Sequence, residues 1–430
     1  MSRIAEGRKK SPRERLRELV RTPQMLSQWS RARSTLAAQP SEEPPKSLVI
    51  LSADGRDPFG SRGDEAMIQA IIDEARRRTP DVRIGIATAG NDLPERIVAQ
   101  GVEAVPVWRA PWNLGDIAKG LRAYDALLVI GADVLDGYYS SITSLRLWMV
   151  AEIFASAGGR AVIGGFSFNS SAAWPVRLFL KNKLSPSLAI NLRDPVSLRR
   201  FDALSATPGR RVADCAFMLK PRESDAIAQT LAWVRAQRAE GRPVCGLNVH
   251  PMLVPNRDPE EIGRLVEAAA TAARRLIDET GSSVVLLPHD FRGETHGDVA
   301  LLARVLEAID RPGHAFLQDK EISAGEIKAI AAELDMVFTG RMHLAIGSLG
   351  SGVPVVGITY QGKFAGLFEH FSLSEEQLIA PEEAKDAERL SRLVLDSFAK
   401  APALRAQVAE ALPQVKSASQ SNLSTLWPVA

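Results

Sequence analysis

The sequence predicts an α/β protein with two doubly wound, Rossmann-like domains that face a cleft. Its 430 residues exceed what one hydrophobic core normally serves, so two domains are the default expectation. From Ser47 onward, short apolar runs alternate with longer amphipathic segments. The apolar runs are continuous rather than alternating, which is typical of strands covered by helices on both faces and therefore of parallel sheets.

Composition places the chain among ordinary globular proteins, since 45% of its residues are hydrophobic and 24% are charged. Every apolar run falls short of the ~20 residues that span a bilayer, and the N-terminus lacks the apolar core of a secretory signal. The two cysteines, Cys215 and Cys245, each lie inside an apolar run. This position favours buried thiols over a disulfide framework or a zinc site, so we expect a reducing, cytoplasmic location.

Residues 1–45 are expected to form a basic arm and a linker. Residues 1–33 hold ten Arg or Lys against three Glu, whereas the rest of the chain is net negative and lacks the global basic field of a nucleic-acid binder. Three apolar side chains at positions 16, 19 and 20 share a helical face, which Pro23 is expected to interrupt. The first interpretation is a solvated or loosely packed arm. The alternative is a basic amphipathic segment that makes peripheral contact with anionic lipid of the inner membrane.

The N-terminal domain is expected at residues 46–220. Its apolar runs predict six strands, and the amphipathic segment after the first run predicts a helix. The expected strands are residues 47–53, 82–88, 102–107, 126–131, 160–166 and 188–192, and the expected helix is residues 64–78.

The C-terminal domain is expected at residues 221–380, with a final helix and tail at 381–430 that either closes this domain or crosses back to the first. The expected strands are residues 244–249, 283–287, 335–339 and 353–359, and the expected helices are residues 224–237, 259–279, 299–309, 324–333 and 382–400. Ligands of doubly wound sheets bind at the carboxyl ends of the strands. A cleft between the domains is therefore the expected active site.

Several common motifs are absent from the sequence: the dinucleotide fingerprint, the P-loop, the zincin His-Glu-x-x-His and the hydrolase Gly-x-Ser-x-Gly. The sequence therefore does not favour a dinucleotide oxidoreductase, a P-loop ATPase, a zincin or an α/β-hydrolase. The sequence does not point to a metal either. Asp133 and Asp136 follow a predicted strand and carry the right ligand atoms, but strand-end aspartates more often cap the next helix.

The most informative stretch runs from Asp335 to Tyr360. It predicts a strand, a tight turn at Gly340, a helix, and a second strand, which places Arg341 and His343 on the first turn of a helix at the carboxyl end of a strand. The free N–H groups there attract an anion, and an arginine can hold phosphate or carboxylate through two hydrogen bonds. A histidine, with a reference pKa of ~6.5, can exchange a proton near neutrality. The alternative is a capping arginine and a core histidine.

Two cations are predicted near the same cleft. Lys363 follows the next strand of the second domain, and Arg193 follows the last main strand of the first domain. A solvated lysine and a structural Arg–Asp ion pair are equally open interpretations of these positions.

Two further segments are candidates for substrate binding. Asp64 stands at the predicted start of the first helix, where it either caps the helix or binds sugar hydroxyls. His289 and Asp290 follow a strand of the second domain and face the cleft side, whereas Asp298 is expected to cap the next helix.

These segments together resemble the polysaccharide pyruvyl transferases, which add pyruvate ketals to cell-surface glycans. The resemblance covers roughly residues 47–375. Its elements are Arg-Gly-Asp-Glu-Ala-Met67, Arg193-Asp194 with Ser197, Pro288-His-Asp290, Gly340-Arg-Met-His343 and Gly352-Val-Pro-Val-Val-Gly-Ile-Thr-Tyr-x-x-Lys363. The resemblance implies a GT-B-like fold and phosphoenolpyruvate as a donor substrate, with no separate cofactor.

The resemblance also implies roles for the candidate residues. Arg341, Arg193 and Lys363 would bind the donor's phosphate and carboxylate, which requires the domains to close, and His343 would be the general acid/base. Asp64 and His289 would contact substrate. The acceptor would be an exopolysaccharide precursor, and a lipid-linked one stays open. Two alternatives remain: a GT-B nucleotide-sugar glycosyltransferase, and a non-catalytic relative that is an assembly partner for glycan enzymes.

Overall fold

The computed structural model describes residues 11–36, 38, 43–110, 112–293, 297–359 and 363–427, except for the side chain of Lys363. The chain divides into two compact units. Unit 1 comprises Met1–Phe59, Met67–Cys215 and Ser417–Ala430, and unit 2 comprises Gly60–Ala66 and Ala216–Lys416. The main boundary lies near the predicted position 220. The assignment of residues 60–66 to unit 2 was not predicted.

Unit 1 is built on a seven-stranded parallel sheet with the strand order β3-β2-β1-β4-β5-β6-β7. Its strands are β1 (Ser47–Leu51), β2 (Arg83–Ala87), β3 (Val102–Val105), β4 (Ala126–Ile130), β5 (Arg160–Phe166), β6 (Leu188–Leu192) and β7 (Arg210–Arg211). The six predicted strands are confirmed within two residues at each end. The seventh, β7, has only two residues and was not predicted.

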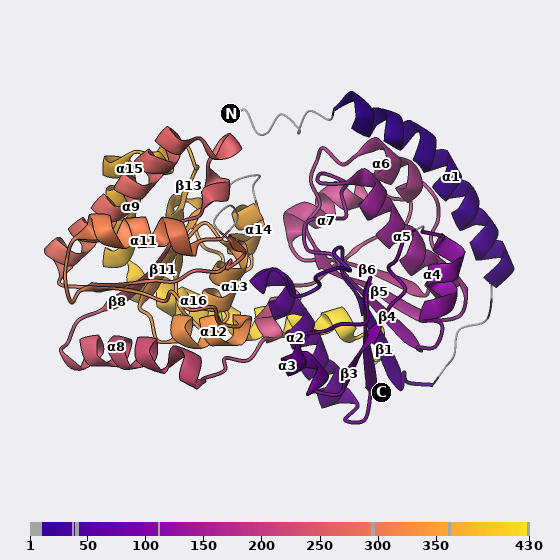
Figure 1. Ribbon diagram of the computed structural model, residues 1–430, viewed down its shortest axis with the longest axis horizontal. Coiled ribbons are helices and arrows are strands. Elements are labelled where there is room, and N and C mark those ends of the chain that lie inside the picture. Colours follow the sequence, from indigo (N-terminus) through magenta and orange to yellow (C-terminus); the bar gives the residue numbers. More distant parts are fainter. Residues whose placement is uncertain are drawn as a thin grey trace. The chain divides into compact units, whose positions relative to one another are not determined.

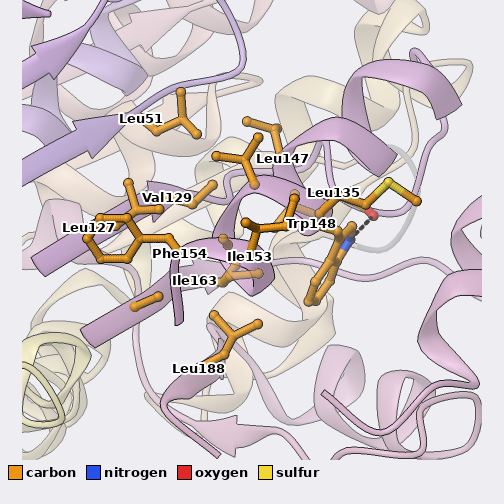
Figure 2. Close-up of a cluster of buried hydrophobic side chains, with 14 of the residues drawn as sticks. Leu51, Leu127, Val129, Leu135, Leu147, Trp148, Ile153, Phe154, Ile163 and Leu188 are labelled. Atoms are coloured by element: carbon orange, nitrogen blue, oxygen red, sulfur yellow. Dashed lines mark hydrogen bonds between the residues drawn. The ribbon is translucent and has the colours of Figure 1, made fainter. Parts of the chain in front are cut away.

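The helices of unit 1 lie on both faces of this sheet (Figure 1). They are α1 (Pro12–Leu36), α2 (Arg62–Arg78), whose first turn belongs to unit 2, α3 (Glu95–Val98), α4 (Leu114–Leu121), α5 (Ser141–Ser156), α6 (Trp174–Leu180) and α7 (Pro195–Asp202). Helix α5 is apolar on every side, so it must be covered on every side. Figure 2 shows its Trp148 beside Leu135, whose carbonyl accepts the indole N–H at 2.9 Å.

The prediction of a loosely packed N-terminal arm was wrong for residues 12–36. They form one helix, α1, which continues through Pro23 and packs against α4, α5 and α6. Trp29 is buried, its indole N–H donates to Glu152 of α5 at 2.7 Å, and its ring meets Phe179 edge-on. The physical reason is that α5 needs a second apolar layer, and this tertiary packing outweighs the local effect of proline.

Unit 2 has a six-stranded parallel sheet with the order β10-β9-β8-β11-β12-β13. Its strands are β8 (Val244–Asn248), β9 (Ser283–Leu286), β10 (Ala315–Leu317), β11 (Met336–Thr339), β12 (Val355–Ile358) and β13 (Leu378–Ile379). The four predicted strands are confirmed. The two others, β10 and β13, form the edges of the sheet and are too short to show a hydrophobic pattern.

The longer helices of unit 2 are also arranged on both faces of its sheet. They are α8 (Ala228–Ala239), α9 (Pro259–Thr280), α11 (Val299–Ile309), α12 (Ala324–Ala332), α13 (Met342–Leu349), α14 (Lys363–Glu369), α15 (Ala387–Ala399) and α16 (Ala401–Gln420). Helices α9, α11 and α15 share one hydrophobic cluster with β8 and β9. Two parallel sheets between helices confirm the predicted fold class. No helix among the described residues has the length and apolarity to cross a membrane.

Candidate active site

The carboxyl ends of β8, β9 and β11 bring together the polar residues of unit 2. Asn248 and Thr339 are register partners on neighbouring strands, so these two strands end at the same level. The Thr339 hydroxyl donates to the Asn248 side-chain oxygen at 3.2 Å. Side chains that follow the three strands therefore converge at one edge of the sheet, as expected for a doubly wound domain.

Helix α13 begins at this edge in the way the sequence predicted. Arg341 is the N-cap residue, and its backbone N–H donates to the Thr339 hydroxyl at 2.9 Å. His343 lies on the first turn. Gly340 is required by packing, because a Cβ atom there would lie 2.9 Å from Nε2 of His250. The local geometry thus places a cation and an imidazole at a helix N-terminus, where free N–H groups favour anions.

A buried carboxylate, Asp298, fixes the Arg341 side chain. Asp298 is fully buried, and its carboxylate accepts hydrogen bonds from both Nε and Nη2 of Arg341. It also accepts the Asn248 side-chain amide at 2.9 Å and the backbone N–H of His289 at 2.9 Å. Asp298 occupies the predicted N-cap position of α11, but its side chain makes no capping hydrogen bond there. It connects three strand ends instead.

A second carboxylate, Asp290, lies 3.6 Å from Nη1 of Arg341. Burial raises the pKa of Asp290, but hydrogen bonds from Arg292 and the charge of Arg341 outweigh it and hold that pKa below its usual value. Arg341 therefore faces two carboxylates and keeps 14% of its side chain exposed. An anion that binds here meets an arginine whose position is already set, which reduces the entropy lost on binding.

Three histidines surround Arg341. The rings of His289 and His343 are nearly parallel, at 14°, with centroids 6.4 Å apart. His250 follows β8 and is fully buried. Burial, then Arg341, lowers the pKa of His250 well below its ordinary value, and burial, then His343 and Arg341, lowers the pKa of His289 in the same way. His250 and His289 are therefore neutral at pH 7.

The first turn of α2 belongs to this cluster because residues 60–66 are part of unit 2. The Nε of Arg62 donates to the Ile322 carbonyl at 2.7 Å, and its guanidinium lies 5.3 Å from the centre of the Phe291 ring. Its charge contributes to the lowered pKa of His289. A Cβ atom on Gly63 would lie 2.3 Å from Nδ1 of His343, so only glycine fits there. The site thus holds two arginines and three histidines.

Sequence reasoning missed Arg62 and His250 for different reasons. His250 lies two residues beyond β8, so the rule that ligands bind at strand carboxyl ends could have found it. Arg62 begins the motif Arg-Gly-Asp-Glu-Ala-Met67, but it is distant in sequence from every other member of the cluster, so the motif alone does not indicate a place in unit 2.

Asp64 does not have the predicted N-cap position. Ser61 precedes α2, and its hydroxyl accepts the backbone N–H of Asp64 at 3.1 Å and donates to the Asp64 carboxylate at 2.8 Å. Serine is a favoured N-cap and its short side chain reaches the third helical residue, so the helix starts two residues before the predicted position. The Asp64 carboxylate accepts the Ser61 hydroxyl and so stabilises this helix start.

Arg193 is enclosed within unit 1. Its side chain is 3% exposed, and Nη1 donates to Asp214 at 2.7 Å while Nε donates to the Ser167 hydroxyl at 2.7 Å. The partner of the ion pair is Asp214 rather than the neighbouring Asp194, whose carboxylate caps α7 through Ser197. These contacts favour the structural interpretation of Arg193, and its expected contact with the donor stays a prediction, as does domain closure.

Lys363 and Asp136 are the remaining candidate residues. Lys363 begins α14, but its side chain is outside the described residues. Asp136 neither caps a helix nor groups with metal ligands: its carboxylate accepts the Tyr138 N–H at 2.8 Å and the Asn169 amide at 2.6 Å. Within the described ranges, no group of three His, Cys, Asp or Glu side chains is arranged to hold a metal ion.

Comparison with protein families identifies the group to which this architecture belongs. The model for "polysaccharide pyruvyl transferase" matches residues 62–362, which is more than half of the chain. The chain belongs to the polysaccharide pyruvyl transferase family. This pyruvyl transferase family member is accordingly an enzyme of the transferase class. The matched range begins at Arg62 and contains all three histidines of the cluster, as well as Arg341. No curated protein matches the sequence.

Solved structures of low sequence identity share the fold of this family member. A UDP-N-acetylglucosamine 2-epimerase from Listeria monocytogenes, described as putative, has a TM-score of 0.57 at 12% identity, with 88% of this chain and 95% of that chain covered. The UDP-GlcNAc 2-epimerase from Neisseria meningitidis has a TM-score of 0.52 at 9% identity, over 88% and 99%. A glycosyltransferase from Rickettsia africae has 0.50 at 10%, over 89% and 99%. These likenesses establish a GT-B architecture alone.

Proposed function

We propose that this transferase moves the pyruvyl group of phosphoenolpyruvate onto two hydroxyls of a sugar in a cell-surface glycan precursor, forming a pyruvate ketal. The observation that carries the proposal is the grouping of Arg341, Arg62 and His343 at the N-terminus of α13. Phosphoenolpyruvate carries a phosphate and a carboxylate, and arginines bind both through paired hydrogen bonds. The helix N-terminus adds donors for the same charges.

The chemistry requires a proton donor beside the enol. Protonation of the methylene carbon makes the adjacent carbon electrophilic. A sugar hydroxyl adds to it and gives up its proton to the deprotonated general acid/base, and inorganic phosphate then takes up a proton and leaves with the C–O bond electrons. A second hydroxyl then adds to the same carbon and loses its proton. We assign the proton transfers to His343, because it lies on the first turn of α13 next to the anion-binding N–H groups.

The neutral partners of His343 support that assignment. His289 lies parallel to its ring, and the pKa of His289 is lowered by burial and then by His343. His289 is therefore neutral and adds no charge of its own beside His343. The acceptor is proposed to be an exopolysaccharide precursor, with a lipid-linked repeat unit as one form. We place the reaction in the cytoplasm, which the free, buried thiols of Cys215 and Cys245 support.

The first test measures phosphate release from phosphoenolpyruvate with a panel of candidate glycans. His343→Ala is expected to lower kcat by roughly 10²–10⁴-fold, the usual worth of a general acid/base. Arg341→Ala and Arg62→Ala are expected to act mainly on KM for the donor. His314→Gln, a change elsewhere in unit 2, is the matched control. Full turnover by His343→Ala would remove His343 from the mechanism.

A binding test separates this proposal from the glycosyltransferase alternative. A specific ligand raises Tm by mass action, so phosphoenolpyruvate should raise the Tm of the wild-type protein but raise it less for Arg341→Ala. UDP- and GDP-sugars are the comparison ligands. A shift with a nucleotide sugar and none with phosphoenolpyruvate would favour the glycosyltransferase alternative, and no ligand response or turnover at all would favour a non-catalytic assembly partner.

A further inference from the structure

Helix α1 has an outward face that takes no part in the core of unit 1. Leu16, Leu19 and Val20 are 63%, 62% and 53% exposed. At 100° per residue they lie away from the side that carries the buried Met25 and Trp29. Single exposed apolar side chains are normal on a protein surface, but three within five residues of one helix form a patch.

The exposed part of α1 is also strongly cationic. The helix contains six arginines and two glutamates, and both glutamates are engaged. Glu14 accepts the backbone N–H of Ser11 at 2.7 Å, and Glu18 is buried and accepts the hydroxyl of Ser141 at the start of α5. With six arginines against two glutamates, α1 has a formal net charge of +4.

Arg146 of α5 adds positive charge near Arg17 and Arg21 of α1, although its own side chain is buried. Arg146 is buried, with its guanidinium 3.3 Å from the centre of the Trp112 ring and 5.4 Å from that of Trp108. Within the described part of the chain it forms no ion pair. Burial, then the charges of Arg21 and Arg17, lowers the pKa of Arg146 to about 9. The positive charges of Arg17, Arg21 and Arg146 therefore repel one another. A bound anion would reduce this repulsion.

We propose that the outward face of α1, together with Arg17 and Arg21, docks the protein on an anionic lipid surface. We call these residues, with Leu16, Leu19 and Val20, the α1 surface. The apolar side chains would enter the boundary of the acyl region, and the arginines would bind lipid phosphates. A soluble phosphate would contact only the arginines and leave the apolar side chains in water. A lipid surface accounts for both the cationic and the apolar side chains. Docking of this kind requires neither the proposed donor nor the proposed reaction.

The rigid attachment of α1 gives the docking an orientation. Trp29 binds Glu152, and Glu18 binds Ser141, so α1 is fixed to α5 along its length. Ser141, which contacts Glu18 of α1, begins the helix that follows β4. Trp112, which contacts Arg146, lies in the loop after β3. The α1 surface therefore lies near the loops that follow these two strands. Those loops stand at the carboxyl ends of the strands, where doubly wound sheets bind ligands. If the proposed glycan acceptor is lipid-linked, this edge of unit 1 is the one presented to it.

The apolar half of the α1 surface is tested by vesicle cosedimentation of the full chain. Vesicles of phosphatidylcholine with about a third phosphatidylglycerol supply the anionic surface, and pure phosphatidylcholine vesicles are the comparison. Leu19→Ser is expected to weaken binding about tenfold, because its exposed leucine loses apolar contact with lipid. Val98→Ser, which changes another exposed apolar residue of unit 1, is expected to bind like the wild type.

The cationic half is tested in the same assay with Arg17→Gln/Arg21→Gln. Two lost charges near an anionic surface are expected to weaken binding about thirtyfold. The matched control is Arg210→Gln/Arg211→Gln, which removes the same charge from the exposed strand β7. Far-UV circular dichroism and Tm check that each variant is folded.

Four results would overturn the proposal. The first is no binding of the wild type to anionic vesicles, and the second is equal binding to neutral and anionic ones. The third is self-association of the wild-type chain, seen by sedimentation velocity. In that case Leu19→Ser would dissociate the dimer, while vesicle binding is absent or unchanged. That result would assign the α1 surface to a second copy of the chain. Binding that glycerol phosphate in solution abolishes would assign the arginines to a soluble anion instead.

Discussion

Asp298 sets the geometry of the candidate site at the scale of single residues. It is fully buried and accepts hydrogen bonds from Arg341, Asn248 and the backbone of His289. These partners come from the ends of three different strands. One carboxylate therefore holds in place both the cation that we expect to bind the donor and the segment that carries a neighbouring histidine.

Asp298→Asn is expected to destabilise unit 2 by roughly 3–5 kcal/mol, the usual effect of breaking a buried ion pair. The reason is that the guanidinium of Arg341 loses its main counter-charge while it stays largely buried. Urea unfolding followed by intrinsic fluorescence measures the loss. Asp278→Asn, which removes an exposed ion pair with Arg311 in the same unit, is expected to change stability little. Equal effects of the two variants would contradict this role of Asp298.

A pH dependence follows from His250 and His289. Both have a folded-state pKa well below the ordinary value, whereas the unfolded chain binds their protons near pH ~6.5. The unfolded state therefore takes up more protons as the pH falls, and stability is lost below about pH 6.5, by up to ~1.4 kcal/mol per pH unit and histidine. Urea unfolding between pH ~7 and ~5 measures the slope. His250→Gln should reduce that slope, and an unchanged slope would be inconsistent with a neutral buried His250.

The sequence predicts the position of Arg341 and His343 because a strand, a glycine turn and a helix are all local patterns. It does not predict what their side chains meet. The carboxylate of Asp298 is 43 residues from Arg341, and Arg62 is farther still from the cluster. Such contacts depend on which strands are neighbours and at which level they end, and a single sequence does not contain that information in any one segment.

At the scale of elements, α1 is a structural helix of unit 1 as well as a candidate docking helix. Its inner face supplies Trp29 to a pocket formed with Phe179 and Glu152. Its outer face carries the exposed Leu16. A substitution on the inner face should therefore lower the stability of unit 1 more than a substitution on the outer face.

Trp29→Ala is expected to destabilise unit 1 by about 3–5 kcal/mol, since it leaves a cavity and removes a hydrogen-bond donor from the buried Glu152. Leu16→Ala, on the exposed face of the same helix, is expected to stay within about 0.5 kcal/mol of the wild type. Thermal unfolding of full-length variants checks both values. A stable Trp29→Ala protein would mean that α1 is not part of the core.

Hydrophobic pattern predicted the long, buried elements well and the others poorly. The strands β5 and β6 have the predicted bounds because both are continuous apolar runs. The edge strands β10 and β13 have three and two residues, so their formation depends on a neighbouring strand rather than on their own composition. Helix α1 was mistaken for an arm because its basic composition and Pro23 concealed a buried face.

At the scale of the whole molecule, the two units exchange segments of chain. Residues after Ser417 complete unit 1, and Asn422 shows how: its side-chain oxygen accepts the Gly165 N–H at 2.7 Å, and its amide donates to the Ala213 carbonyl at 2.8 Å. Asn422 is fully buried. A short segment that follows unit 2 in sequence thus satisfies backbone groups of Gly165 in β5 and of Ala213 after β7.

Asn422→Ala is expected to destabilise unit 1 by about 2–4 kcal/mol, because it leaves a buried N–H and a buried carbonyl without partners. Hydrogen exchange should show faster exchange in β5 and β6 and no change in β8 to β12. Ser421→Ala, the exposed neighbour, serves as the control. Faster exchange confined to unit 2 would show that the segment does not support unit 1.

The position of residues 417–427 also affects the order in which the protein can mature during synthesis. The ribosome completes the polypeptide of unit 2 before it translates the segment that binds Gly165 and Ala213. At 5–20 residues per second, the nascent chain waits about 10–40 s between Cys215 and that segment. Throughout this interval, Gly165 and Ala213 lack the side chain that satisfies them. A message interrupted shortly after Lys416 would encode every residue of the candidate active site, yet leave a product that proteases and chaperones can recognise as unfinished.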